Sequence, residues 1–341
     1  MRALYYPAWN ELEVREVPIP SPNEGEVLLR VASCGICGSE LETFKNASPR
    51  RTPPLIMGHE FCGQVEEGRG GEAGSLAGQK MISHAIVHCG QCPACLRGDT
   101  NLCGGRQVFG MHRTGALAEY VAVPERILIP WPAGLPAASA IFAEPLANGI
   151  NALRQGSSPR RSRIVVIGAG PIGLMCLFAA KRIHHANVVV SDRLAERLQA
   201  ARILGADCTV NVLQQDLETE VRTHWSGERA EYVIDAVGNA ETKRLALALV
   251  EPGGTVVWVG LHEDQMSLNS YAVTLGQKCV AGSYSGSLND LKLAVQLLAS
   301  ENMDTSWATQ YPMEQAATAF RDLLKEEEKK VKAIVQFHAA L

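Results

Sequence analysis

Four cysteines fall within fifteen residues, at Cys89, Cys92, Cys95 and Cys103, and their spacing is C-x2-C-x2-C-x7-C. Four thiolates spaced in this way form a closed tetrahedral zinc site. Bacterial iron–sulfur runs have a shorter last gap and a following proline, whereas Cys103 is followed by two glycines. The pattern therefore favours zinc. Because a four-thiolate site leaves no coordination position for substrate, it predicts a structural metal.

A second group of possible ligands lies upstream and downstream of these cysteines. It contains Cys37, His59, Glu60 and Glu144. This is a mixed sulfur, nitrogen and oxygen set, of the kind that leaves one zinc coordination position free for chemistry. We therefore expect catalysis at this second site.

Two plainer interpretations of these residues stay open on spacing alone. Cys34 and Cys37 have the C-x-x-C spacing of a redox pair, although the segment before them reads as a strand and not as the expected helix. A single histidine such as His59 is often only a hydrogen-bonded residue. We give that interpretation to the other histidines considered: His84, His88, His112, His184, His185 and His262.

A glycine-rich turn follows an apolar run at "RIVVIG" and precedes a helical run that starts at Pro171 and Ile172. Gly168, Gly170 and Gly173 form G-x-G-x-x-G. Such glycines permit a tight turn and let a pyrophosphate approach the backbone N–H groups at a helix N-terminus. The pattern predicts a dinucleotide site.

The next apolar run, "NVVVSD", ends in Asp192, 19 residues beyond Gly173. A carboxylate at this distance accepts hydrogen bonds from the ribose hydroxyls of the adenosine. It would also repel a 2′-phosphate, which favours NAD as the cofactor. The neighbouring Arg193 works in the other direction, because an arginine there can accept NADP.

The elements that must position these residues divide the chain in two. Residues 1–150 read as short strands separated by Gly and Pro, which indicates a mainly β region. After a polar connector at 154–162, strand-like runs alternate with helical patterns, as in βαβ units on a parallel sheet. Two amphipathic helices, at 288–301 and 314–330, and a strand at 332–337 complete the chain.

Composition narrows the class of protein. The chain has 341 residues, 46% of them hydrophobic, and a net charge of −4 with scattered Lys and Arg, which argues against binding to nucleic acid. It shows no leader peptide and no membrane-length apolar run, so we expect a cytoplasmic protein with no membrane partner. Ten cysteines in a reducing compartment favour thiols and metal ligands over disulfides. We expect small-molecule partners.

A family resemblance follows from the order of the motifs "CGICGSE", "GHEFCG", "HCGQCPACLRGDTNLC", "AEYVAVP", "FAEPLA" and "VVIGAGPIGL". The chain resembles the zinc-containing medium-chain dehydrogenases, and within them the polyol branch of sorbitol, galactitol-1-phosphate and idonate dehydrogenases. The resemblance implies an α/β protein with a GroES-like, mainly β catalytic domain (1–150 and 289–341, with the zinc lobe at 88–104). It implies a doubly wound, parallel-sheet Rossmann domain at 151–288 and a homodimer or homotetramer.

The resemblance also implies roles. Cys37 and His59 would be catalytic zinc ligands, and Glu60 a direct or closely coupled one. Glu144 takes the place of the third cysteine of simple alcohol dehydrogenases, and which carboxylate touches zinc stays open. Ser39 matches the hydroxyl that takes the substrate proton.

The resemblance has two gaps on the proton path. Where related relays continue to a histidine, this chain has Glu42, and Glu40 replaces the more usual Asp. The resemblance further places four residues beside the nicotinamide, at the ends of two Rossmann strands: Val237, Gly238, Val259 and Leu261.

These expectations add up to an enzyme with two zinc ions per chain that transfers a hydride from a secondary alcohol to NAD. The substrate is expected to be a polyol, a sugar acid or a sugar-alcohol phosphate, and Lys45, Arg50 and Arg51 could hold its anionic group. The alternatives are an L-threonine 3-dehydrogenase-like or general alcohol dehydrogenase activity. Outside that class they are a zinc-free quinone reductase and a non-enzymatic cofactor-binding protein.

Overall fold

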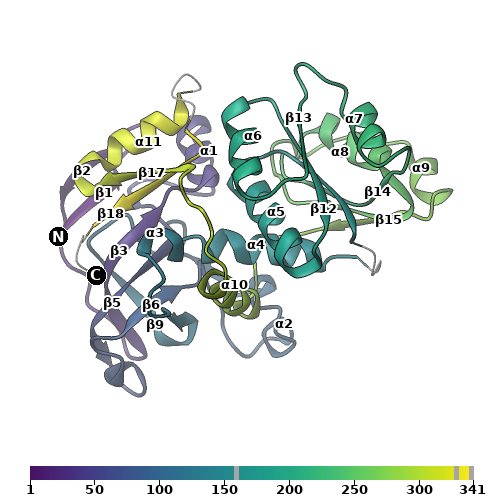
Figure 1. The fold of residues 1–341 in the computed structure, drawn as a ribbon. Helices are drawn as coiled ribbons and strands as arrows, with labels where there is room; N and C mark the ends of the chain where they lie inside the picture. The colour runs from purple at the N-terminus through teal and green to yellow at the C-terminus, as the bar shows by residue number, and fades with distance from the viewer. Residues whose placement is uncertain (157–160, 326–329, 338–341) are drawn as a thin grey trace. The chain divides into compact units, whose positions relative to one another are not determined.

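The computed structural model describes residues 1–156, 161–325 and 330–337 (Figure 1). Parts of the predicted connector at 154–162 and of the charged helix end at 325–330 lie outside these residues. The chain forms two compact units, Met1–Glu144 with Ser287–Leu341, and Pro145–Gly286. None of the helices in the described ranges is both long enough and apolar enough to span a bilayer.

The first unit is built on a seven-stranded sheet. Its central strand, β3, corresponds to the apolar run "EVLLRVAS" and is buried along almost its whole length. Around β3 the strands lie in the order β10 (Leu128–Pro130), β6 (Lys80–Ser83), β5 (Glu60–Arg69), β3 (Glu26–Gly35), β18 (Lys332–Gln336) and β17 (Ala308–Pro312), and β9 (Tyr120–Pro124) also pairs with β3.

Two smaller sheets and several helices complete this unit. One sheet joins β2 (Glu13–Glu16), β1 (Arg2–Tyr6) and β4 (Leu55–Ile56), and the other joins β7 (Ile86–Val87) and β8 (Gln107–Val108). The helices are α1 (Gly38–Asn46), α2 (Pro93–Leu96), α3 (Ala137–Ala140), α10 (Leu288–Ser300) and α11 (Ala316–Leu324), with short 3-10 turns η1 (Ala73–Ser75), η2 (Thr100–Leu102), η3 (Glu125–Ile127) and η4 (Met313–Gln315). Helix α4 (Ala143–Arg154) begins at the division between the units.

The end of the chain returns to the first unit as a strand. Strand β18 pairs antiparallel with β3, with Val335 opposite Cys34, and parallel with β17 (Figure 1). The residues of β18 are therefore neighbours of the segment that leads into α1. The preceding helix, α11, ends at Leu324, so it is shorter than the run predicted from the sequence.

The second unit is a six-stranded sheet in which every pairing is parallel. Its order is β13 (Cys208–Asn211), β12 (Asn187–Asp192), β11 (Arg163–Ile167), β14 (Ala230–Asp235), β15 (Val250–Trp258) and β16 (Cys279–Gly282). Numbered along the chain this is 3-2-1-4-5-6, the order of a Rossmann dinucleotide-binding sheet. The predicted fold class is confirmed.

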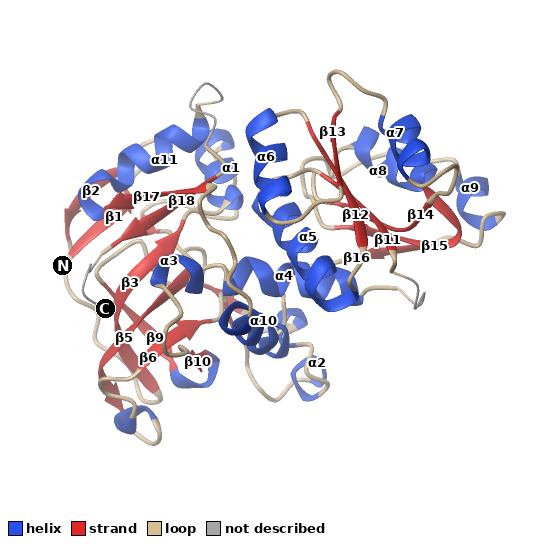
Figure 2. Cartoon of the chain, viewed as in Figure 1, coloured by secondary structure: helices blue, strands red, loops and turns tan. Residues whose placement is uncertain are grey.

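Helices lie on both sides of this sheet (Figure 2). They are α5 (Pro171–His184), α6 (Ala195–Ile203), α7 (Leu217–His224), α8 (Ala240–Leu249) and α9 (Ser270–Thr274). Because both faces are covered, the central residues of the strands are mostly apolar and do not alternate; Val165, Val189 and Val233 are among their fully buried residues. Each unit has its own hydrophobic core.

Candidate functional site

The four cysteines of the predicted zinc lobe come together in the first unit. Their sulfur atoms all lie within 4.8 Å of one another. Cys89 Sγ is 3.9 Å and Cys92 Sγ is 3.5 Å from Cys95 Sγ. Zn–S bonds of about 2.3 Å in a tetrahedron separate sulfurs by about 3.8 Å, so this donor set fits zinc.

Backbone N–H groups of the lobe point at the sulfurs. The N–H of Cys89 donates to Cys103 Sγ over 3.3 Å, and that of Cys92 donates to Cys89 Sγ over 3.4 Å. Hydrogen bonds of this kind, led by the one from the N–H of Cys95, lower the pKa of Cys92 to about 6. Burial raises the pKa of Cys95 to about 12, so the hydrogen bonds favour the thiolate, the form that binds metal, at Cys92 and not at every cysteine of the lobe.

The second cluster contains Cys37, His59 and Glu60, whose ligand atoms also lie within 4.8 Å of one another. Strand pairing explains this approach. Gly35 at the end of β3 is opposite Glu60 at the start of β5, so the turn into α1 and the residues before β5 meet at one edge of the sheet. The set of one sulfur, one nitrogen and one carboxylate oxygen fits a zinc site with an open position.

A buried carboxylate, Glu40, holds the histidine and the backbone of this cluster. The Nδ1–H of His59 donates to Glu40 Oε1 over 2.9 Å, and the N–H groups of Gly58 and Cys37 donate to its carboxylate over 2.8 and 3.0 Å. Burial alone would raise the pKa of Glu40, but the charges of His59 and Arg51 help to lower it to about 2. With Nδ1 engaged, the other ring nitrogen of His59 is left for a metal.

Lys332 is a member of this site that sequence reasoning missed. It lies on β18, is fully buried, and its ammonium group donates to Glu60 Oε2 and, over 2.9 Å, to the carbonyl oxygen of Ile36. Burial would lower the pKa of Lys332, but the carboxylate of Glu60 raises it. The only sequence signal was one lysine at the start of an otherwise apolar strand.

Ser39 lies beside the cluster, on the first turn of α1. Its side chain is exposed, and Ser39 Oγ donates to Cys37 Sγ over 3.4 Å. Cys34, the possible redox partner of Cys37, is fully buried inside β3, and burial raises the pKa of its thiol. The structure thus brings Cys37 to a hydroxyl and to metal ligands.

The expectation that Arg51 binds a substrate anion is wrong. Its side chain is 3% exposed, and its guanidinium donates to Gly110, Ser39 and Thr43. The sequence could not reveal this, because two of the four acceptors are backbone oxygens and all four come near Arg51 only in the fold. Lys45 and Arg50 are exposed.

The glycine-rich turn connects β11 to α5 in the second unit. A Cβ at Gly173 would lie 1.8 Å from the carbonyl oxygen of Gly168, so only glycine lets the helix pack on the turn. A Cβ at Gly170 would meet no described atom within 4 Å, and no described side chain caps the helix that begins at Pro171. The space beside Gly170, where α5 begins with Pro171 and Ile172, is therefore free of described atoms, which fits a pyrophosphate at the helix N-terminus.

Asp192 lies at the end of β12, next to this turn. Its carboxylate accepts hydrogen bonds from the N–H groups of Ala169, over 2.8 Å, and Leu194, over 2.9 Å. Arg197 also lies at this site, although the sequence did not indicate it. Its Nη1 is 3.7 Å from Asp192 Oδ2, and its buried Nε has no hydrogen-bond partner among the described residues. An unpaired N–H group beside the Asp192 carboxylate is consistent with a site for a polar ligand. Arg193 is exposed.

The residues predicted beside the nicotinamide follow β14 and β15. A Cβ at Gly238 would lie 2.1 Å from Gly260, and one at Gly168 would lie 2.7 Å from Val237. The strand ends therefore pack closely around the turn. Val259 is half-buried, and Leu261 is 60% exposed.

Comparison with known proteins covers both units. Residues 23–133 match the alcohol dehydrogenase GroES-like domain, and residues 171–300 match the zinc-binding dehydrogenase domain. L-Galactonate-5-dehydrogenase of Escherichia coli K12 is 31% identical over 327 residues, which are 95% of this chain and 94% of that protein. The chain belongs to the zinc-type alcohol dehydrogenases. The resemblance predicted from the motifs, including the polyol branch, is confirmed.

Two further relatives of this zinc-type alcohol dehydrogenase support the assignment. D-Arabitol-phosphate dehydrogenase of Enterococcus avium is 32% identical over 332 residues, 95% of this chain and 94% of that protein. The crystal structure of the rspB alcohol dehydrogenase of Escherichia coli CFT073, complexed with NADH, matches with a TM-score of 0.91 at 26% identity over 99% of each chain. The chain is a zinc-binding oxidoreductase of CH–OH groups with a nicotinamide dinucleotide cofactor and a small-molecule substrate.

Two acidic residues of the dehydrogenase stand apart from the ligand cluster. Glu144, in the first turn of α4, is 6% exposed. Among the described residues, the cluster of ligand atoms within 4.8 Å of one another contains Cys37, His59 and Glu60 and does not contain Glu144. Glu42 is exposed on α1. The roles of both residues stay predictions.

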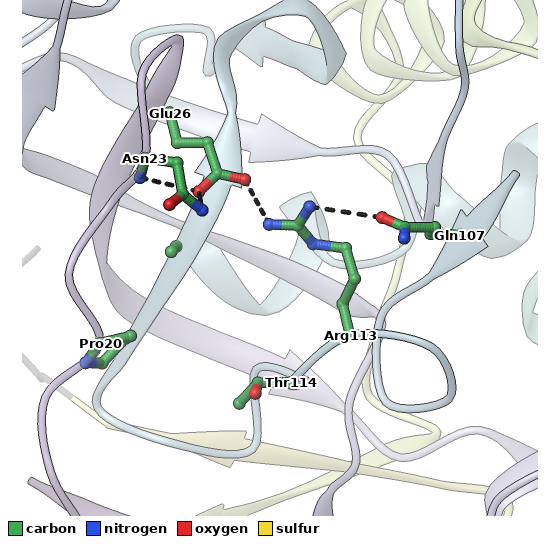
Figure 3. Close-up of a pocket in the computed structure, with 7 residues that line it drawn as sticks. Pro20, Asn23, Glu26, Gln107, Arg113 and Thr114 are labelled. Carbon is green, nitrogen blue, oxygen red and sulfur yellow. Dashed lines mark hydrogen bonds and ion pairs between the residues drawn. The ribbon is translucent and has the colours of Figure 1, made fainter.

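A cavity of about 290 Å³ in the first unit contains no residue of either ligand cluster. Its polar side chains bond to one another: Arg113 reaches Glu26 on one side and Gln107 on the other, and Asn23 Nδ2 donates to Glu26 over 2.9 Å (Figure 3). The lining residues are Pro20, Asn23, Glu26, Gln107, Arg113, Thr114 and Ala122. These pairings give the dehydrogenase a structural ion pair and no free catalytic group.

Proposed function

We propose that this dehydrogenase oxidises one secondary hydroxyl of a polyol, a sugar acid or a sugar-alcohol phosphate, with NAD as the hydride acceptor. One observation carries the proposal: Cys37, His59 and Glu60 converge, with the exposed hydroxyl of Ser39 3.4 Å from Cys37 Sγ. The substrate hydroxyl loses a proton and its carbon loses a hydride, so the products are a ketone, NADH and a proton.

We assign Cys37, His59 and Glu60 to the catalytic zinc, and Cys89, Cys92, Cys95 and Cys103 to the structural zinc. Bound zinc supplies a Lewis acid that favours ionisation of the substrate hydroxyl, and bound NAD supplies the hydride acceptor. Ser39 accepts the proton of that hydroxyl. Glu40 orients His59, and Lys332 holds Glu60.

The cofactor is held by the second unit. The N–H groups at the start of α5 bind the pyrophosphate, and Gly170 leaves room for it. Asp192 accepts from the ribose hydroxyls and disfavours a 2′-phosphate, which supports NAD over NADP. Val237, Gly238, Val259 and Leu261 are proposed to border the nicotinamide.

The substrate class is supported by the metal ligands and by the relatives. A carboxylate in place of a third thiolate makes the metal site harder, which suits substrates with adjacent hydroxyls. L-Galactonate-5-dehydrogenase and D-arabitol-phosphate dehydrogenase act, by their names, on a sugar acid and a sugar-alcohol phosphate. Exposed Lys45 and Arg50 would contact an anionic group.

We also propose a homodimer or homotetramer in the cytoplasm. All ten cysteines lie in the described residues and none forms a disulfide, as expected in a reducing compartment. Light scattering of the purified protein would measure the assembly.

A substrate panel tests the proposal. The zinc-loaded enzyme is given NAD with neutral polyols, aldonates, polyol phosphates, L-threonine and primary alcohols, and NADH absorbance is followed. We expect the highest kcat/KM with one of the first three groups. A preference for L-threonine or for primary alcohols would contradict the substrate class, and reduction of quinones without zinc would contradict the reaction itself.

A further inference from the structure

The guanidinium of Arg51 joins three segments of the first unit. Its Nε donates to the carbonyl oxygen of Gly110 over 3.0 Å, and its Nη1 donates to the carbonyl oxygen of Ser39 over 2.9 Å and to Thr43 Oγ1 over 3.3 Å. Together with the nearby charge of Glu40, these acceptors explain how the structure tolerates a buried cation. They would suffice for a purely structural role.

A fourth hydrogen bond of Arg51 reaches the side chain of Ser39, the residue proposed to take the substrate proton. Nη2 donates to Ser39 Oγ over 3.1 Å, and Ser39 Oγ itself donates to Cys37 Sγ over 3.4 Å. A hydroxyl has one hydrogen and two lone pairs. With its hydrogen on Cys37 and one lone pair on Arg51, Ser39 keeps a single lone pair for another donor.

On the basis of the proposed function, we propose that Arg51 is the positioning residue of the proton-transfer step: it fixes the side chain of Ser39 so that the remaining lone pair accepts the proton of the substrate hydroxyl. The proton that Ser39 had donated to Cys37 then passes to water at the exposed side chain, and the proton taken from the substrate restores the hydroxyl and its bond to Cys37. Without Arg51, the Ser39 side chain can turn among its staggered rotamers and bond to the helix backbone instead.

This role differs from the two alternatives in what it predicts for turnover. A substrate-binding arginine would change KM for anionic substrates and leave neutral polyols unaffected. An arginine that only joins segments would change stability. A residue that positions Ser39 changes kcat for neutral and anionic substrates alike, with KM unchanged.

The test is a double-mutant cycle on zinc-loaded enzyme with NAD and the best neutral polyol. Arg51→Gln and Arg51→Lys are each made alone and together with Ser39→Ala. Single turnovers at high enzyme concentration keep slow variants measurable. We expect each Arg51 variant to lower kcat about 10- to 100-fold with KM changed less than about twofold, and to have no further effect once Ser39 is alanine. The lysine variant keeps the charge, so it serves if the glutamine variant does not fold.

Thr43→Val is the matched control. It removes a hydroxyl that bonds to Arg51 and to the backbone carbonyl of Ser39, but leaves the bond between Arg51 and Ser39 Oγ. We expect lower thermal stability with kcat within about twofold of the unmodified enzyme. Zinc content and the NADH dissociation constant, measured for every variant, should be unchanged.

Three results would overturn the inference: equal kcat losses from Arg51→Gln with and without Ser39, a change confined to KM for anionic substrates, or a loss of kcat in Thr43→Val as large as that in Arg51→Gln. The proposed function fails separately, if the unmodified enzyme oxidises no member of the panel. If it oxidises polyols but Ser39→Ala keeps full kcat, the role of Ser39 and this inference both fail.

Discussion

Lys332 and Glu60, one of the proposed metal ligands, form a buried ion pair with exposed fractions of 0% and 1%. The pair lies in a region where water cannot screen or replace either charge. The intact pair holds the Glu60 carboxylate in place. In the zinc-free protein, loss of the lysine leaves that carboxylate buried without a cation.

Lys332→Met should lower the free energy of unfolding of the zinc-free protein, in which Glu60 has no metal beside it, by about 3–5 kcal/mol, the usual cost of breaking a buried pair. Urea unfolding measures it. Lys332→Arg should cost less, and Lys292→Met on the exposed face of α10 should stay within about 0.5 kcal/mol. A loss below about 1 kcal/mol for Lys332→Met would contradict a charged buried pair.

Asp192→Ser should narrow the preference for NAD over NADP, because it removes the carboxylate that repels a 2′-phosphate while Arg193 and Arg197 remain. The ratio of kcat/KM for the two cofactors measures this. Equal kcat/KM for both cofactors in the unmodified enzyme would defeat the assignment. The variant should also lose about 1 kcal/mol of stability, since Asp192 accepts from two backbone N–H groups.

The residues of the site differ in how far the sequence could predict them. Cys37, His59 and Glu60 were found because their types are metal ligands, although the sequence left the choice between Glu60 and Glu144 open. Glu60 is 272 positions from Lys332, and Arg51 reaches Ser39 and Gly110, 12 and 59 positions away, only because the fold brings them together. No local pattern encodes such a contact, so one arginine was assigned to the wrong partner and the lysine was missed.

Among the elements, the turn between β11 and α5 needs glycine at two positions for different reasons: Gly173 for packing and Gly170 for cofactor binding. Gly173→Ala should destabilise the protein, because its Cβ would collide with the carbonyl oxygen of Gly168. Gly170→Ala should fold normally, since φ is −68° and the space is free, but should bind NADH at least about 10-fold more weakly. Thermal unfolding and NADH fluorescence separate the two, and equal behaviour of both variants would contradict this division.

Substitutions in the two metal-binding segments should also have different effects. Cys95→Ser should remove one zinc per chain and lower stability or disrupt the assembly, while folded molecules stay active. Cys37→Ser should remove the other zinc and abolish turnover with the fold retained. Elemental analysis and assay of each variant test this, and a stable but inactive Cys95→Ser protein would show that the lobe is not structural.

These two elements were well predicted because each is local. The lobe and the turn are continuous stretches of sequence in which spacing alone sets the geometry. The catalytic cluster instead depends on the register that places Gly35 opposite Glu60 and on the return of β18 to β3. The sequence indicated those strands but not their pairing, since periodicity shows which face of a strand is buried and not which neighbour it has.

For the whole molecule, two units with separate cores predict two unfolding transitions in calorimetry. NADH should raise the transition temperature of the unit 145–286 alone. At an NADH concentration 100 times the dissociation constant, the free energy of unfolding of that unit should increase by about 2.7 kcal/mol. Removal of zinc by a chelator should lower the transition temperature of the other unit alone. A single transition that responds to both treatments would show that the two cores unfold as one.

The late return of β18 also sets the order in which the two metal centres can form in a cell. A ribosome makes Glu60 272 residues before Lys332, a delay of roughly 15 to 55 seconds at about 5–20 residues per second. During this time the nascent chain holds Cys37, His59 and Glu60 without the strand that completes their sheet. The four-cysteine lobe needs only fifteen consecutive residues and can take up zinc during translation. The catalytic centre is completed only once β18 has been made and has paired with β3, so it forms later than the four-cysteine lobe.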